Sequence, residues 1–165
     1  MKKFLLVACL ALVCATSAMA LEKGNKAIGI NLLYGTEIES MGIGAKAQYV
    51  FHEHWRGEAA FNYFFERKHT HMWEINLTAH YLVNLGEKFH VYPLAGPTVV
   101  NATTDLGDFG YGEGTNTSQT KFGLNLGGGL EYDVSENFTV GLEARYSIVS
   151  KIDQAVFGIG ATYHF

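Results

Sequence analysis

The chain has 165 residues, of which 48% are hydrophobic and 13% aromatic, with 12 Lys and Arg against 16 Asp and Glu. This composition is not that of a disordered chain, and 2 Pro against 19 Gly is unlike a Pro-rich linker. The formal charge of −4 argues against nucleic-acid binding, because that function needs a basic face.

The first twenty residues have the organisation of a secretion signal. Lys2 and Lys3 supply a positive start, and residues 4–13 form a short apolar stretch. Small residues at positions 17–20 then suit cleavage after Ala20. About ten apolar residues are too few for a membrane helix, which needs about 20. The segment therefore predicts export rather than a membrane anchor.

We expect two regions, a cleaved signal peptide over residues 1–20 and one domain over residues 21–165. Cleavage would remove both cysteines, Cys9 and Cys14, so the mature domain would use neither disulfides nor thiol chemistry. Residues 6–9 also resemble a lipobox, but cleavage there would leave an apolar core of only about five residues.

An alternation of period two recurs along the domain. Apolar residues occupy every second position, with polar or small residues between them, in seven stretches: 27–34, 43–51, 56–65, 73–81, 121–132, 138–146 and 157–165. This period predicts strands with one apolar face. An eighth stretch, residues 89–100, contains Pro93 and Pro97, and its apolar face is ambiguous. We therefore expect eight strands.

The connections between the stretches alternate in length. Tight turns are expected at three connections (52–54, 84–88 and 135–137), and mostly longer ones at the other four (35–40, 66–71, 101–119 and 149–153). Outer-membrane barrels place short turns at one end and longer loops at the other. An even number of strands would put both termini at the short-turn end, facing the periplasm.

Alternation alone also fits a soluble barrel, whose apolar face lies inside around a ligand. Aromatic residues near both ends of the apolar rows favour lipid outside instead, because they suit an interfacial girdle (Tyr34, Phe51, Phe65, Trp73, Tyr81, Tyr132, Tyr146, Phe157 and Phe165). The pattern predicts an all-β fold: a closed, eight-stranded, antiparallel, up-and-down transmembrane β-barrel. A soluble periplasmic ligand-binding barrel stays an alternative.

The last 44 residues, which begin FGLNLGGGLEYDVSENFTVGLEARY and end FGIGATYHF, resemble the small porin-like outer-membrane β-barrel family. That resemblance implies an eight-stranded barrel of the OmpA/OmpX-like class, located in the outer membrane and surrounded by its lipid. The terminal row is similar to the signal that the barrel-assembly machinery reads in that family, which makes this machinery an expected partner during biogenesis (Phe157, Ile159, Ala161, Tyr163 and Phe165). The resemblance implies a fold and a compartment rather than an activity.

The interior of an eight-stranded barrel is just wide enough for side chains to fill it. By parity, nine charged residues point inward: Lys46, Arg56, Glu58, Glu74, Lys121, Glu131, Asp133, Glu143 and Arg145. Near-balanced charge suits paired side chains rather than a selective ion path. We hypothesise that Glu143 and Arg145, with Lys46 and Glu58 nearby, form a buried polar plug, with glycines opposite them making room. The alternative is a gate that opens to a narrow pore.

The longest connection, residues 101–119, is rich in Gly, Thr, Asn and acidic residues. Asp105 and Asp108 precede two aromatic residues at its middle, Phe109 and Tyr111. Exposed aromatics among small polar residues suit contact with a surface ligand or an adhesion partner.

Two histidine pairs, His52 with His54 and His69 with His71, raise the question of a metal site. The topology puts them at opposite membrane faces, so they cannot share an ion, and neither a metal nor a cofactor is expected. No spacing suggests a Ser/His/Asp set. The sequence therefore predicts a monomeric, non-enzymatic barrel with a structural or adhesion-type role, and a narrow low-conductance channel is the alternative.

Overall fold

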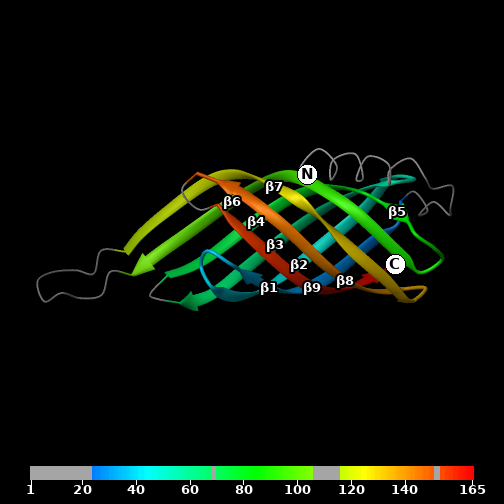
Figure 1. Cartoon of the computed structure of the whole chain (residues 1–165), viewed down its shortest axis with the longest axis horizontal. Helices are drawn as coiled ribbons and strands as arrows, with labels where there is room; N and C mark the ends of the chain where they lie inside the picture. Colours follow the sequence, from blue (N-terminus) through cyan, green and yellow to red (C-terminus); the bar gives the residue numbers. More distant parts are fainter. Residues whose placement is uncertain (1–23, 68–69, 106–115, 151–152) are drawn as a thin grey trace, which may run out of the picture.

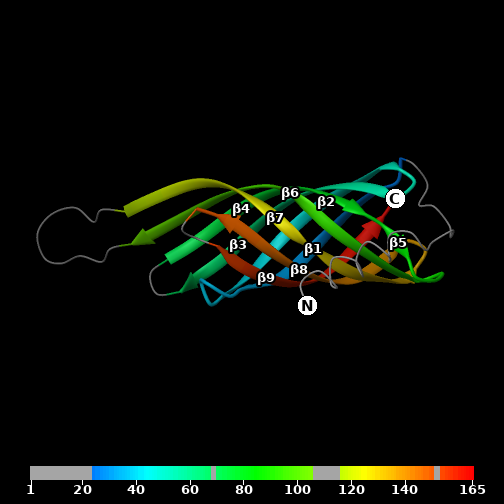
Figure 2. The same cartoon turned by 45° about the horizontal axis from the view of Figure 1, so that its top comes forward.

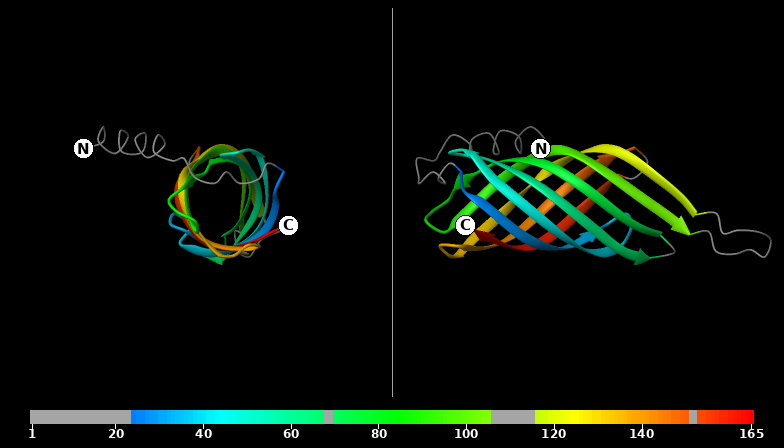
Figure 3. Two further views of the ribbon diagram at one scale, coloured as in Figure 1. Left: turned by 90° about the vertical axis from the view of Figure 1, so that its right-hand side faces the viewer. Right: turned by 180° about the vertical axis from the view of Figure 1, so that it is seen from behind.

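The computed structural model describes residues 24–67, 70–105, 116–150 and 153–165 of the chain, and the expected signal peptide over residues 1–20 lies outside them. Within these residues the chain forms nine strands: β1 (Lys26–Gly35), β2 (Ser40–His52), β3 (Trp55–Arg67), β4 (Thr70–Tyr81), β5 (Val83–Asn84), β6 (Phe89–Asp105), β7 (Asn116–Ser135), β8 (Phe138–Val149) and β9 (Gln154–His164). Each strand pairs antiparallel with its neighbours, and β1 pairs with both β2 and β9. Pairing of β4 with β6 closes the sheet into a ring, visible end-on in Figure 3.

β4 and β5 are two parts of a single barrel strand. The pairing His80↔Leu94 on β4 and the pairing Val83↔Val91 on β5 belong to one uninterrupted register against β6. That register sets Tyr81 opposite Pro93, which has no N–H to donate to the ladder. The interruption at Leu82 therefore has a local cause, and the barrel has the eight strands that the sequence predicts.

Apolar side chains face outward and polar ones face inward. On β1, Ile28, Ile30 and Leu32 are 54–69% exposed, whereas Glu74 and His80 on β4 are completely buried in the lumen. This arrangement is the reverse of a soluble ligand-binding barrel, so that alternative is wrong. In the described residues no helix is long and apolar enough to span a membrane, a finding that does not bear on strands.

β6 was the stretch whose facing the sequence left open. Tyr92, Leu94 and Val100 are buried inside the barrel, while Pro93 and Pro97 face outward. Both prolines thus lie in the lipid-facing row, where their rings are apolar.

The connections fall at two ends, as Figure 1 shows. β1, β3, β6 and β8 finish at one end, which we call the loop end, and the turns at 53–54, 85–88 and 136–137 lie at the other, the turn end. Phe165 also lies at the turn end, where its N–H donates to the carbonyl oxygen of Lys26 (2.9 Å). The chain therefore finishes at the short-turn end, in agreement with the sequence.

Two predicted connections were wrong in their bounds. The segment 101–119 is mostly strand, because β6 runs on to Asp105 and β7 begins at Asn116. The connection predicted over 66–71 is too long, because β3 continues to Arg67 and β4 begins at Thr70. Backbone beyond the bilayer can pair without an apolar row, so these strand ends show no alternation. The β6–β7 hairpin consequently projects past the other strands at the loop end (Figures 1 and 2).

Candidate functional site

The lumen contains an ion pair that crosses from β3 to β7. Arg56 donates from both terminal nitrogens to the two carboxylate oxygens of Glu131, each at 2.9 Å. Both side chains are buried. Because β3 and β7 are not neighbours in the sheet, this bidentate pair ties two separate walls of the barrel together.

Tyr92 and His80 pack beside this pair. Their rings stack with centroids 4.6 Å apart and an interplanar angle of 11°, and the Arg56 guanidinium lies 5.0 Å from the Tyr92 ring centroid. Arg56 also donates to His80 Nδ1 (3.1 Å), so His80 Nε2 carries the proton and donates to Thr78 Oγ1 (2.9 Å). The histidine is therefore held in one neutral tautomer.

A second network centres on Glu74 of β4, whose side chain is fully buried. Its Oε1 accepts hydrogen bonds from Asn62 (2.8 Å), from Asn76 (3.0 Å) and from Arg145. Arg145 also donates to Glu143 at 2.9 Å. Glu74 is thus the main acceptor at this level of the lumen.

Lys46 and Glu58 form a third pair, with Nζ and Oε2 3.6 Å apart, and Gln48 donates to the same oxygen at 2.7 Å. The Tyr92 hydroxyl donates to Glu143 at 3.2 Å, which joins the group around Arg56 to the group around Arg145. We call these three groups of inward side chains together the lumen network: Lys46, Gln48, Arg56, Glu58, Asn62, Glu74, Asn76, Thr78, His80, Tyr92, Glu131, Glu143 and Arg145.

Glycines make room for the large side chains of the lumen network. Glycines lie opposite Glu143 and Arg145 as expected, because Gly129 pairs with Glu143 and Gly127 pairs with Arg145. A Cβ on Gly129 would fall on the ring of Tyr92. A glycine at this position therefore permits the stack of Tyr92 on His80.

Ligand atoms of Glu58, His80 and Glu143 lie within 4.8 Å of one another, a spacing that could suit a metal ion. However, both ring nitrogens of His80 are engaged by Arg56 and Thr78. A ligand nitrogen must offer a free lone pair, so this cluster is better described as part of the lumen network than as a metal centre.

Above the lumen network, at the loop end, the interior becomes apolar. Six side chains that are at most 3% exposed form what we call the apolar cluster: Leu33, Phe64, Met72, Val100, Val149 and Val156. They come from six strands, and Ile38 and Ala102 pack against them. This cluster was not predicted, because polar residues were expected at the inward positions. Parity would have placed Leu33 and Phe64 on the inward face, whereas Val100 lies on β6, whose facing the sequence left open.

The remaining predicted positions fall at the surface. Asp108, Phe109 and Tyr111 lie outside the described residues, as does the side chain of Asp105, the last residue of β6. The terminal row of β9 faces outward, with all but the half-buried Ala161 exposed (Phe157, Ile159, Ala161, Tyr163 and Phe165). Its role as an assembly signal stays a prediction.

The histidine pairs separate as expected where they can be followed. His52 and His54 lie at the turn end and His71 at the loop end, while His69 is outside the described residues.

Solved structures with the same architecture include three outer-membrane barrels. The N-terminal β-barrel domain of Pseudomonas aeruginosa OprF superposes with a TM-score of 0.71 at 17% identity, covering 87% of this chain and 98% of that one. Ail, the attachment invasion locus protein of Yersinia pestis, gives 0.63 at 22% identity, covering 87% and 100%. Neisserial surface protein A gives 0.67 at 17% identity, covering 86% and 96%. These identities establish a shared fold alone.

No curated protein matches the chain. The model of the family described as outer membrane protein beta-barrel domain matches residues 5–165, almost the whole sequence. Together with an outward apolar surface and a closed ring of strands, this match places the protein in the cell outer membrane, surrounded by lipid. The chain belongs to the outer-membrane protein β-barrel domain family.

Proposed function

We propose that the protein is a monomeric, non-enzymatic surface-interaction barrel that binds an extended peptide segment of a partner through the projecting part of β7. The loop end would face the cell exterior and the turn end the periplasm, the usual orientation of such barrels. The observation that carries the proposal is an unpaired strand edge at the loop end.

Residues 116–122 of β7 pair with β6 on one side. On the other side, within the described residues, the pairing with β8 starts at Gly123↔Val149. Unpaired N–H and C=O groups along a strand edge are a template for another extended chain. Asn101 stiffens the hairpin, because its amide donates to Ser118 (3.0 Å) and Thr120 (2.8 Å).

The closed interior supports a role at the surface rather than in transport. The lumen network ties β3 to β7 and β4 to β8, and the apolar cluster fills the lumen above it. A solute would have to displace both layers, so a narrow channel is the weaker interpretation.

Charge indicates the kind of partner. Among the described residues, the loop end carries five acidic residues against two basic ones (Glu37, Glu39, Glu66, Asp105 and Asp153 against Arg67 and Lys121). Ail has been solved in complex with sucrose octasulfate, a heparin analogue. The acidic loop end here is unsuited to such a polyanion, which favours a neutral or basic peptide.

The test removes one edge donor. Asp133 donates its N–H to the carbonyl oxygen of Lys88, just before β6, at 2.9 Å. Because the register between β6 and β7 has no shift, the N–H groups of all odd-numbered residues of β7 point toward β6. Those of even-numbered residues, including Ser118, therefore point toward the open edge. Peptides selected from a phage-displayed library on the full chain in nanodiscs should bind Ser118→Pro about five- to tenfold more weakly, because one hydrogen bond is worth about 1 kcal/mol and the proline ring adds a clash.

Ser118→Ala is the matched control, since it keeps the backbone N–H and should bind the selected peptides as the wild type does. Equal binding by wild type and Ser118→Pro would exclude the open edge as the contact surface.

A further inference from the structure

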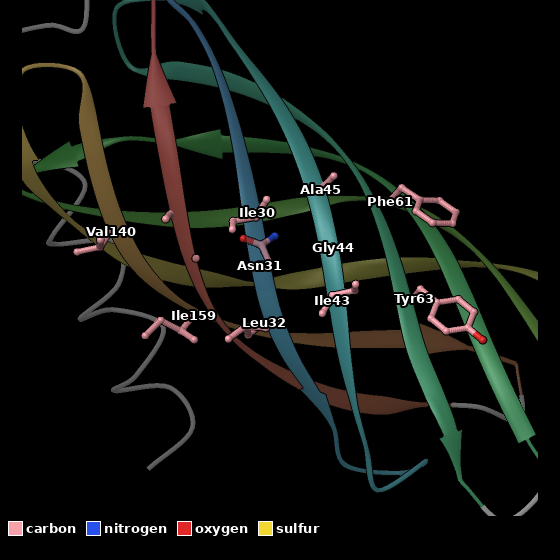
Figure 4. Close-up of a pocket in the computed structure, with 12 residues that line it drawn as sticks. Ile30, Asn31, Leu32, Ile43, Gly44, Ala45, Phe61, Tyr63, Val140 and Ile159 are labelled. Atoms are coloured by element: carbon pink, nitrogen blue, oxygen red, sulfur yellow. The ribbon is translucent and has the colours of Figure 1, made fainter.

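The outer wall formed by β9, β1, β2 and β3 is hollowed. Two hollows of about 650 and 830 Å³ share Ile30, Ala45, Phe61 and Ala161, so they form one groove. Figure 4 shows its loop-end part, with Ile159 at one side, Ile30 and Ala45 in the middle, and Phe61 and Tyr63 at the other side. The groove therefore runs along the lipid-facing surface, within the span of the strands.

Small and large side chains alternate across this wall in a way that shapes the groove. Register pairs Ile30 with Ala45 and Ala45 with Phe61, and one step toward the turn end it pairs Ala47 with Ala59. Alanines form the floor, and larger residues line the sides: Ile28, Ile30, Phe61, Ile75, Phe138 and Tyr163. The wall formed by β7 and β8 differs, because its outward rows carry large exposed residues (Leu124, Leu126, Leu130, Leu142, Tyr146 and Ile148).

The two ends of the groove differ in charge. At the turn end, Lys26 is exposed and continues the outward row of β1 beyond Ile28, about 7 Å away. Tyr49 pairs with Lys26, and Tyr163 pairs with Ile28; both tyrosines are exposed. A cation with one phenol group directly opposite and a second at the next outward level suits a phosphate at the level of the lipid headgroups.

At the loop end the neighbouring charges are acidic. Glu37 and Glu39 lie in the connection between β1 and β2, and Glu66 is exposed near the end of β3. These carboxylates disfavour an anionic headgroup there. The charge asymmetry thus orients an anionic lipid with its headgroup toward the turn end.

We propose that the groove binds one acyl chain of a phospholipid from the leaflet at the turn end, with the lipid phosphate at Lys26. A flexible acyl chain can follow the uneven floor of the groove through both hollows. A second copy of the barrel fits less well, because groove against groove leaves two hollows face to face. Packing the large β7–β8 rows into the groove would be a heterologous contact between two different faces, which builds rings or open chains rather than a symmetric dimer.

The experiment uses the full chain reconstituted in vesicles of phosphatidylglycerol and phosphatidylcholine, with phosphatidylglycerol spin-labelled near the end of one acyl chain. Electron paramagnetic resonance counts the motionally restricted lipids per barrel. The double variant Ala45→Leu/Ala47→Leu fills the floor and should lose one restricted lipid per barrel. Ala144→Leu, an outward alanine on β8 away from the groove, should lose none.

Lys26→Glu tests the headgroup, with Lys88→Glu in the turn at 85–88 as its control. Lys26→Glu should lower the preference for phosphatidylglycerol over phosphatidylcholine several-fold, while Lys88→Glu should not change it. A gel shift between heated and unheated samples verifies that each variant is folded.

Three results would overturn the proposal. One is a restricted-lipid count that is the same in the wild type and the filled-groove variant, or that falls equally in Ala144→Leu. Another is a wild-type dimer that dissociates when the groove is filled, which assigns the groove to a second copy. The third is retention of lipopolysaccharide in place of phospholipid, which assigns it to the other leaflet.

Discussion

Arg56 bridges the lumen through two hydrogen bonds to Glu131 and a third to His80. Arg56→Met removes all three and leaves the Glu131 carboxylate buried without its counter-ion. Breaking one side of a buried pair costs about 3–5 kcal/mol, so we expect the free energy of unfolding to fall by that amount. Urea unfolding in lipid vesicles, followed by tryptophan fluorescence, measures it.

The double variant Arg56→Met/Glu131→Leu is the control for this prediction. Replacing both members of a buried pair by apolar groups is often close to neutral, so the double variant should recover most of the lost stability. A double variant as unstable as Arg56→Met would show that the loss has another origin.

Glu74 and Glu143 differ in how many partners depend on them. Glu74 accepts from Asn62, Asn76 and Arg145, whereas Glu143 is 14% exposed at its side chain and accepts from Arg145 and Tyr92. Glu143→Ala leaves Arg145 paired with Glu74. We therefore expect Glu74→Ala to cost roughly 1–3 kcal/mol more than Glu143→Ala in the same unfolding assay. Equal losses would contradict the central position of Glu74.

Strand parity could predict which charged residues point into the lumen, but not which of them form ion pairs with one another. Arg56 and Glu131 are 75 residues apart on strands that do not pair, and the tilt of the strands decides which levels coincide. His80 and Tyr92 were missed as members of the network. Tyr92 lies on β6, where Pro93 and Pro97 obscure the alternation, so no pattern in the sequence aims its ring at His80.

Among the strands, β6 and β4 approach each other closely at Gly96, so a substitution there tests how the two strands pack. A Cβ on Gly96 would fall on the carbonyl oxygen of Leu77 and the Cα of Thr78, both backbone atoms that cannot rotate away. Overpacking of this kind costs about 1–3 kcal/mol, so Gly96→Ala should lower the unfolding free energy by that amount. The midpoint of urea unfolding measures the change.

Gly86, in the turn at 85–88, provides the matched control, because an added Cβ there meets nothing within 4 Å. Gly86→Ala should change stability by less than about 0.5 kcal/mol. If the two alanine variants were equally stable, β4 and β6 would have to be further apart than the structure has them.

The sequence predicts elements well only where the bilayer constrains them. Lipid on one side forces the alternation of Ile28, Ile30 and Leu32, and seven such rows could therefore be recognised, while the eighth stretch was less clear. Beyond the bilayer, Thr103 and Ser118 face water, and strand pairing there leaves no apolar row to find. For this reason the hairpin ends of β6 and β7 were predicted as loop.

At the scale of the whole molecule, the two closed layers of the lumen predict an electrically silent barrel. The purified chain should give no single-channel steps in planar bilayers. Phe64→Ala should also remain silent, because the lumen network below the apolar cluster still closes the interior. Regular conductance steps from the folded wild type would contradict this and restore the channel hypothesis.

The overall architecture followed from the sequence because a membrane permits few solutions: a sheet in hydrocarbon must close, and closure fixes which face is polar. The apolar cluster did not follow. Leu33 and Phe64 occupy inward positions where polar residues were expected, and only the closure of the strands around one lumen brings them together. A pattern within a single strand cannot predict these contacts across the lumen.

The unequal strands give the barrel a slanted rim. β1 has 10 residues and β7 has 20, so at about 3.4 Å per residue one flank is some 34 Å longer along the strand than the other. On a bacterium whose surface is covered by sugar chains, the low flank at β1 and β2 would be submerged while the tall flank stands clear. Antibodies against intact cells would then bind the projecting part of β6 and β7, which lies on one side of each barrel.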